Sequence, residues 1–309
     1  MRGHLQPGFG LYLPSAWPRR GGLPLLVMLH GCRQDAQSFA TGTGMNRVAE
    51  REGFAVLYPE QDPLANPLRC WNWFRAEVMR GEGESQALVR LVRRIRDRYG
   101  LDAQRVYVAG MSAGAAMAQV LAVRHPELFA AAALHSGVMY GASATPWLAL
   151  STMRHGSPRS PSTLARSVRA ELGPVPCVPT LLIHGQQDDV VVPRNALQAA
   201  EQIRDLAAPA VSPDANPPAM KETFMLEGGR RCSVQEWQRD GRPLVRVCLV
   251  DGLGHAWSGG DASLPYNDAA GPDASRLIWE FVAPFRRAAV PARGDAGAPA
   301  GGATSAVSG

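Results

Sequence analysis

A serine with a glycine two residues away on each side constrains this chain most. Gly110 and Gly114 bracket Ser112; an apolar run typical of a strand comes before them, and an alanine-rich run typical of a helix follows. A strand, a sharp turn and a helix in this order lift a serine hydroxyl clear of the backbone, where close approach requires small neighbours. The helix also points its positive dipole toward the place where an oxyanion would form. The motif predicts that Ser112 is a nucleophile.

A nucleophilic serine needs a base and an acid, which in this arrangement follow it in the order aspartate, then histidine. The apolar run 179–183 predicts a buried strand, and the loop after it carries Asp188 and Asp189. Another strand is predicted over 244–250, and its exit loop holds His255. Because catalytic groups of open α/β sheets gather at the carboxyl ends of strands, these loops predict a triad of the serine, His255 and one of the two aspartates.

Structural roles for these residues stay open as alternatives. Either aspartate could instead cap the helix that follows, since acids favour helix starts. His255 lies in a glycine-rich loop without the pattern of a core residue, so a structural role is less favoured for it. His30, His135 and His184 each end an apolar run, which is typical of hydrogen-bonded structural histidines. We expect His30 and His135 to support the site, and His184 to be a structural histidine rather than a base.

Backbone donors for an oxyanion are predicted from a second loop. The apolar run 25–29 predicts a strand, and Gly31 and Cys32 follow it closely. A glycine there lets backbone amides turn toward a ligand, and the serine turn takes one N–H from such a loop and one from the residue after the serine. We expect the N–H groups of Cys32 and Ala113 to form the oxyanion hole; the alternative is an ordinary tight turn.

Six short blocks support a family resemblance when they are read in order. They are 29–32 (LHGC), 58–61 (YPEQ), 70–73 (CWNW), 110–114 (GMSAG), 135–137 (HSG) and 252–260 (GLGHAWSGG). Together they resemble the polyhydroxybutyrate (PHB) depolymerase-type esterases, α/β-hydrolases related to feruloyl and acetylxylan esterases, over about residues 9–285. The resemblance implies Ser112 as nucleophile, His255 as base and Asp188 as the orienting acid. It also implies hydrolysis of carboxylic esters through an acyl-enzyme, without a cofactor or metal.

The chain departs from the family pattern at a few positions. Ala115 stands where many relatives have a second glycine, and Gln186 and Gln187 replace a more acidic loop. Asp189 beside Asp188 keeps the identity of the acid open.

Strands and helices alternate along the predicted domain. Helices are predicted over 37–52, 84–99, 194–206 and 273–286, and further strands over 54–58, 105–109 and 129–134. Alternation of this kind predicts the α/β class, with a mostly parallel, doubly wound sheet and helices on both faces. With 309 residues and 46% hydrophobic content, the chain can bury one large core. The resemblance implies that this is the α/β-hydrolase fold.

Residues 1–289 are expected to form a single catalytic domain. The segment 145–179 interrupts the strand rhythm and is predicted to be an insertion over the site, with Trp147 and Leu148 as its apolar anchor. Residues 290–309 are rich in Ala, Gly, Pro and Ser, which predicts a disordered tail.

Three tryptophans are candidates for substrate contact. Trp71, Trp73 and Trp257 lie in blocks next to the predicted nucleophile and base, so they could hold a polyester, a phenolic ring or a sugar. Packing in the core is the alternative for each. The leading substrate hypothesis is a hydroxyalkanoate-type polyester or oligomer, followed by a feruloyl or acetylated xylan ester. The alternative from a different functional class is a non-catalytic binding protein with a hydrolase-like fold.

The five cysteines bear on whether the protein works in an oxidising or a reducing compartment. Cys32 and Cys70 fall in loops that should flank the pocket, and Cys232 and Cys248 lie on strands around the turn 240–241, so two disulfides and a free Cys177 are predicted. A two-residue turn would set Cys232 one position off Cys248, so that bridge needs a longer loop or a bulge. Two bridges would favour a secreted or periplasmic protein; reduced thiols in the cytoplasm are the alternative.

Other partners are not indicated. The net charge is +5, but no basic cluster interleaved with aromatics, zinc-type spacing or phosphate loop is present, which argues against nucleic-acid binding. No run approaches the roughly 18 apolar residues of a membrane span. The N-terminal residues lack the apolar core of a signal peptide. A native, a truncated and an engineered N-terminus stay open as alternatives. We take a monomer as the default state.

Overall fold

The computed structural model describes residues 8–15, 17–18, 20–173, 176–207 and 219–287. The predicted disordered tail, 290–309, lies outside these residues. Within the described part of the chain, the main sheet has nine strands in the order β1-β3-β2-β4-β5-β6-β9-β8-β7. In chain order its strands are β1 (Gly8–Tyr12), β2 (Leu25–Leu29), β3 (Ala55–Glu60), β4 (Val106–Met111), β5 (Ala131–His135), β6 (Thr180–Gly185), β7 (Ala219–Glu227), β8 (Arg230–Arg239) and β9 (Arg242–Val250).

The centre of the sheet is parallel and its two edges are antiparallel. Strands β3, β2, β4, β5, β6 and β9 run parallel to their neighbours in that series. Strand β1 lies antiparallel to β3 on one edge, and the β7–β8 hairpin extends the other edge from β9. The central strands are buried on both faces, which their continuous apolar sequences dictate. A small parallel pair, β10 (Trp257–Ser258) and β11 (Asn267–Asp268), lies apart from the main sheet.

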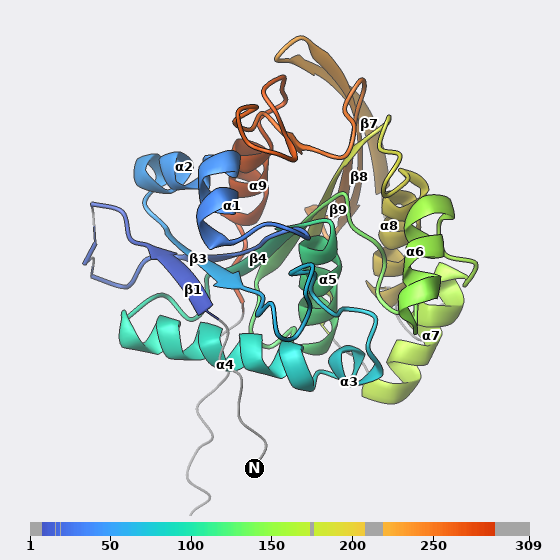
Figure 1. Cartoon of the computed structure of the whole chain (residues 1–309), viewed down its shortest axis with the longest axis horizontal. Coiled ribbons are helices and arrows are strands. Elements are labelled where there is room, and N and C mark those ends of the chain that lie inside the picture. The colour runs from blue at the N-terminus through green and yellow to red at the C-terminus, as the bar shows by residue number, and fades with distance from the viewer. Residues whose placement is uncertain (1–7, 16, 19, 174–175, 208–218, 288–309) are drawn as a thin grey trace, which may run out of the picture.

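Helices cover both faces of the sheet (Figure 1). One face carries α1 (Ala36–Thr43), α2 (Met45–Glu52) and α9 (Ala274–Val282). The other carries α3 (Ala76–Met79), α4 (Gly83–Arg98), α5 (Ala113–Arg124), α6 (Pro146–His155), α7 (Pro161–Leu172) and α8 (Arg194–Ala207). Each face buries its own apolar cluster, so the predicted doubly wound α/β architecture is confirmed.

The helix predicted over 37–52 is two helices. Gly44 adopts φ +63°, a left-handed conformation that ends α1 and begins α2. Glycine tolerates this conformation because it has no Cβ. The periodicity of the sequence continued through the break, so the pattern alone did not reveal it.

The segment 145–179 contains α6 and α7, and its predicted apolar anchor is wrong. Trp147 is 84% exposed, and Leu148 is half-buried. Helix α6 instead buries Ala149 and Thr152 and packs against α8. Thr145 caps this helix through its side chain, so Trp147 falls in the first turn on the solvent face.

The predicted bridge between Cys232 and Cys248 is also wrong, because both cysteines are free. A bulge is present, but it shifts the register the other way: Gln238 pairs with Pro243, whereas Trp237 pairs with Val245. Cys232 therefore lies opposite Val250, and Cys248 is its diagonal neighbour. Diagonal neighbours are separated by roughly 7–8 Å, whereas a disulfide needs Cα atoms within roughly 4.4–6.8 Å.

The two buried thiols contact each other without a covalent bond. A hydrogen bond with Cys232, together with burial, raises the pKa of the Cys248 thiol well above its ordinary value. Burial likewise raises the pKa of Cys177 to about 12. The thiols of Cys248 and Cys177 are therefore protonated at neutral pH, and protonated thiols are poor nucleophiles.

Unfolding without reductant should expose three reactive thiols. In guanidinium chloride, we expect a chromogenic disulfide reagent to titrate Cys177, Cys232 and Cys248, and to titrate five thiols only after reduction. Peptide mapping after alkylation identifies which cysteines reacted. Recovery of a single thiol before reduction would restore the second bridge and contradict the register described above.

Candidate active site

Ser112 occupies a strained turn between β4 and α5. Its backbone has φ 56° and ψ −120°, a left-handed φ that is rare for a residue with a side chain. Its neighbours explain why the turn closes. A Cβ on Gly114 would lie 2.0 Å from the carbonyl oxygen of Leu29, and one on Gly110 would lie 2.4 Å from the carbonyl carbon of Gly114. The two glycines of the motif are therefore required by backbone contact, and Ser112 is left half-buried at the apex.

The loops after β6 and β9 come close together because a glycine, which has no Cβ, lies between them. A Cβ on Gly185 would lie 2.2 Å from the carbonyl oxygen of Leu253, and the Gln187 N–H donates to the same oxygen at 3.0 Å. This contact brings His255 to Asp188, whose Oδ2 accepts a hydrogen bond from His255 Nδ1 at 2.8 Å. The acid and the base expected from the sequence are thus adjacent.

Asp188, and not Asp189, is the buried aspartate of this loop. The Asp188 side chain has no exposed surface, whereas Asp189 is exposed. Oδ1 of Asp188 accepts hydrogen bonds from the N–H groups of Val190 and Val191 at 3.1 and 2.8 Å. Burial by itself would raise the pKa of this carboxyl, but hydrogen bonds from His184 and His255 lower it well below its usual range. The carboxylate is therefore charged whenever His255 needs it.

His135 connects the serine turn to the histidine loop. Its carbonyl oxygen accepts from the Ser112 N–H at 2.9 Å, and its Nε2 accepts from the Ser258 N–H at 3.3 Å. Burial lowers the pKa of His135 to about 3, so the ring is neutral over the working range of most esterases. The supporting role expected for His135 matches these contacts.

The serine and the histidine are not hydrogen-bonded in this structure. Ser112 follows β4 and His255 follows β9, and both lie at the carboxyl ends of these parallel strands, with β5 and β6 between them. Within the described residues, neither Ser112 Oγ nor His255 Nε2 has a hydrogen-bond partner. Both atoms are consequently available to each other and to a substrate, and such catalytic contacts commonly tighten only when substrate binds.

The loop after β2 leaves one amide free. The Gly31 N–H donates to Gln34 Oε1 at 2.8 Å, and the Arg33 N–H donates to the Leu68 carbonyl at 2.8 Å. Cys32, which lies between them, has no acceptor for its N–H in the described part of the chain. Ala113 is the first residue of α5, where backbone N–H groups have no partner within the helix. Both predicted donors therefore have an unused N–H.

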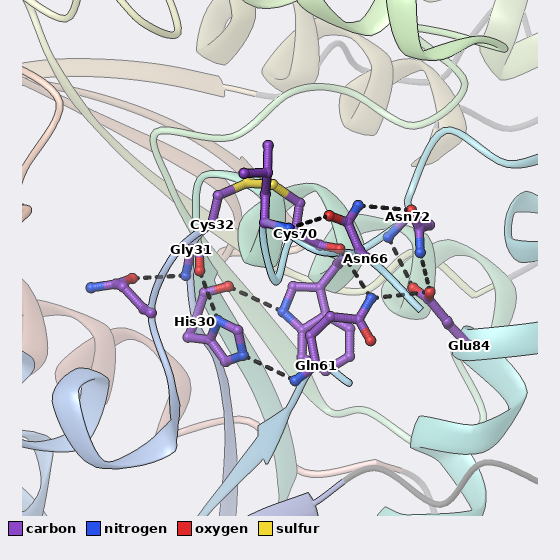
Figure 2. The surroundings of a disulfide bond; sticks show 11 residues. His30, Gly31, Cys32, Gln61, Asn66, Cys70, Asn72 and Glu84 are labelled. Atoms are coloured by element: carbon purple, nitrogen blue, oxygen red, sulfur yellow. Dashed lines mark hydrogen bonds between the residues drawn. A yellow bond between two sulfur atoms is a disulfide. The ribbon is translucent and has the colours of Figure 1, made fainter. Parts of the chain in front are cut away.

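A disulfide and a tryptophan hold this loop in place (Figure 2). Cys32 is bonded to Cys70, which confirms the first predicted bridge. Trp71, the next residue, donates from Nε1 to the His30 carbonyl at 3.1 Å. His30 in turn accepts the Gln61 N–H on Nε2 at 3.1 Å. The loop is thus attached through a covalent bond on one side and through buried hydrogen bonds on the other.

A carboxylate that sequence reasoning missed secures the far side of this brace. Figure 2 shows Glu84, at the start of α4, pointing toward Asn72 and Gln61. Glu84 accepts from the Asn72 N–H at 2.9 Å and from Gln61 Nε2 at 3.0 Å, and it also accepts from Asn72 Nδ2. An acidic residue in the first turn of a helix is ordinary, so nothing in the sequence set Glu84 apart. The neighbouring YPEQ and CWNW blocks were the available signal.

The three candidate tryptophans do not form a substrate-contacting wall. Trp71 and Trp257 are each 1% exposed and Trp73 is 4% exposed. Trp257 stacks on His135 with ring centroids 4.9 Å apart and donates to Ser275 Oγ. The three rings pack in the core, so the expected contact with substrate is not supported by their burial. They instead position the loops that carry the site.

Two absences concern only the described residues. No group of three or more His, Cys, Asp or Glu side chains there has an arrangement suited to a metal ion. No helix among these residues combines the length and apolar character needed to cross a bilayer.

Removal of the disulfide should weaken both the fold and the reaction. For the double variant Cys32→Ala, Cys70→Ala we expect the free energy of unfolding to fall by about 4 kcal/mol, since the bridge closes a 38-residue separation. We also expect kcat to fall by about tenfold or more, toward the roughly 10²–10³-fold cost of losing one oxyanion donor. Denaturant unfolding and ester hydrolysis measure the two effects. Cys177→Ala is the matched control, and a stable double variant with wild-type kcat would contradict the role of the brace.

Comparisons with known proteins agree with this geometry. The family model described as Esterase PHB depolymerase matches residues 8–212. The chain is 31% identical to poly(3-hydroxyalkanoate) depolymerase C of Paucimonas lemoignei over 79% of this chain and 57% of that protein. It is 35% identical to feruloyl esterase B of Neurospora crassa over 58% of this chain and 63% of that protein. The chain thus spans about three fifths of the length of these relatives.

A solved structure extends the likeness over the whole fold. The acetyl xylan esterase from Aspergillus awamori superimposes with a TM-score of 0.69, covering 89% of this chain and 93% of that one, at 21% sequence identity. At that identity the likeness concerns the fold, which is that of the α/β-hydrolases. The match of the family model over most of the chain is the decisive comparison, and by it this chain belongs to the Esterase PHB depolymerase family.

Proposed function

We propose that the chain is a serine esterase in which Ser112, His255 and Asp188 form the triad. The observation that carries this proposal is the 2.8 Å hydrogen bond from His255 Nδ1 to the buried Asp188 carboxylate. This bond lies at the carboxyl ends of the strands, where the strained Ser112 also lies. This bond fixes the proton on Nδ1 and leaves Nε2 free to accept the serine proton. Asp189 is exposed and has no comparable contact, so Asp188 is the orienting acid.

The reaction follows from this geometry. Ser112 Oγ attacks the ester carbonyl carbon while His255 Nε2 takes its proton, and the carbonyl oxygen becomes an oxyanion held by the N–H groups of Cys32 and Ala113. Collapse of this intermediate breaks the bond to the alcohol oxygen, which receives the proton from His255. Water then attacks the acyl-serine with His255 again as base, and the acid product leaves as Ser112 is restored.

Hydroxyalkanoate polyesters or their oligomers are the substrates we propose. Among the relatives above, the poly(3-hydroxyalkanoate) depolymerase aligns over the larger share of this chain. Leu64 and Leu68 are 88% and 53% exposed on the loop that the disulfide closes, and the Leu68 carbonyl binds the oxyanion loop directly. Exposed aliphatic side chains beside the site suit an aliphatic ester chain better than a sugar. Feruloyl and acetylxylan esters are the competing substrates.

We also propose the extent of the catalytic domain, the compartment of the enzyme and its oligomeric state. We propose that residues 1–289 belong to one catalytic domain and that the segment 145–179 is an insertion over the site. A disulfide next to the oxyanion loop suits an oxidising compartment, so we infer a secreted or periplasmic protein. A monomer is the working assumption.

Substitution within the triad tests the mechanism. We expect Ser112→Ala and His255→Ala each to lower kcat by about 10⁴–10⁶-fold with the fold intact, because triad members act as a unit. Asp188→Asn should cost about 10⁴-fold, whereas Asp189→Asn, its matched control, should stay within a few-fold of wild type. Hydrolysis of p-nitrophenyl butyrate gives the rates. A Ser112→Ala variant with a tenth of wild-type turnover would reject the assignment, and absence of hydrolysis in the wild type would favour a binding protein.

A substrate panel tests the proposed ester class. We expect kcat/KM to be highest for 3-hydroxybutyrate oligomers and amorphous PHB, and at least about tenfold lower for methyl ferulate and acetylated xylan, because Leu64 and Leu68 are exposed on the loop. Leu68→Ser should reduce this preference, and Leu197→Ser, an exposed leucine on α8, is the control. A higher kcat/KM for either plant cell-wall ester would replace the polyester assignment while leaving the triad intact.

A further inference from the structure

His184 lies against the acid of the triad and takes no part in the mechanism described above. It is the second-to-last residue of strand β6, just before the acid loop, and its side chain is 1% exposed. Its Nε2 lies 2.6 Å from the Val191 carbonyl oxygen and 3.4 Å from Asp188 Oδ2. Two oxygens therefore face one ring nitrogen.

The contacts of the ring define its proton. Nε2 faces oxygen acceptors, whereas the buried Nδ1 has no hydrogen-bond partner among the described residues. A proton consequently lies on Nε2, and this nitrogen is a hydrogen-bond donor. Its stronger hydrogen bond goes to the Val191 carbonyl, and the longer contact reaches the carboxylate.

The bond to Val191 closes the acid loop onto the strand. Val191 donates its own N–H to Asp188 Oδ1 at 2.8 Å. His184 therefore contacts the same residue that hydrogen-bonds one carboxylate oxygen. The other oxygen, Oδ2, lies between His184 and His255. Rotation of the carboxylate away from His255 would break contacts on both of its oxygens.

We propose that His184 is a positioning residue, which fixes the Asp188 carboxylate in the orientation that His255 requires during ester hydrolysis. This inference rests on the triad proposed above and adds a fourth side chain to it. His184 acts through Asp188 and touches no reacting atom.

The titratable groups around Asp188 agree with this division of roles. Three imidazoles, those of His135, His184 and His255, are electrostatically coupled to its carboxylate. His135 accepts a backbone N–H on Nε2, which keeps that nitrogen unprotonated, whereas His184 donates from Nε2 to a backbone carbonyl. His255 is the most exposed of the three and alone has a free nitrogen on the substrate side. Of the three, His255 is therefore the one that can exchange a proton with a substrate while Asp188 holds its ring.

Two substitutions separate positioning from packing. His184→Gln can place an amide N–H close to the position of Nε2, whereas His184→Met has a similar volume but no donor. We expect His184→Met to lower kcat by about tenfold or more, short of the roughly 10⁴-fold cost of losing the acid's function, with KM within about twofold. The acidic limb of the pH profile of kcat/KM should move to lower pH by about half a unit, because a displaced carboxylate stabilises the imidazolium less. His184→Gln should recover most of kcat and the wild-type limb.

Control variants make each outcome decisive. Gln202→Met removes another buried polar side chain, one that bonds to Tyr140, and reports what loss of stability alone does to kcat. In an Asp188→Asn background His184→Met should have little further effect, because both act through one carboxylate. If His184→Met does not fold, His184→Asn, whose shorter amide cannot reach Val191, replaces it. An unshifted limb with wild-type kcat, or a loss equal to that of Gln202→Met at equal stability, overturns the inference; an active Ser112→Ala variant would instead reject the triad itself.

Discussion

The close approach of helix α5 to the end of strand β2 is the contact on which the rest of the site depends. Gly114 passes so near the Leu29 carbonyl that no side chain fits between them. This contact forces the positive φ of Ser112, and it also places the first amide of α5 beside the loop that carries Cys32. One steric condition therefore positions both the nucleophile and the two donors that would receive the oxyanion. Buried strands on both sides of β4 supply the rigidity that maintains this strain.

Electrostatics completes what sterics begins. Asp188 is buried, and it remains charged because amides and imidazoles face both of its oxygens. The neighbouring Asp189 has the same chemistry but faces solvent. The difference between the two lies in the turn that follows Gly185, whose contact with Leu253 directs one carboxylate inward. Which of two adjacent acids becomes functional is thus decided by a backbone contact about 65 residues away in the chain, as the sequence positions show.

The parts of the molecule that could be predicted from sequence are those specified by local pattern. The serine turn, the order of the strands' exit loops and the pairing of Cys32 with Cys70 all followed from short motifs placed at strand ends. The parts that failed depend on distant partners. The register of Cys232 depended on where a bulge skips Leu244, and the surroundings of Trp257 depended on His135 from another strand. The position of Trp147 depended on how α6 meets α8. An aromatic residue in a motif predicts proximity to a site, but only packing decides which way its ring points.

The sheet topology has a consequence for how such a chain matures. Strands β2 to β5 are consecutive in sequence and adjacent or nearly adjacent in the sheet, so the nucleophile and its amides can assemble from near neighbours. The base arrives later, because β9 is the last strand of this sheet in the chain and pairs between β6 and β8. Long-range pairings of this kind form slowly. A newly synthesised chain would therefore stay inert toward esters in its surroundings until its last central strand has docked, which delays catalytic competence to the end of folding.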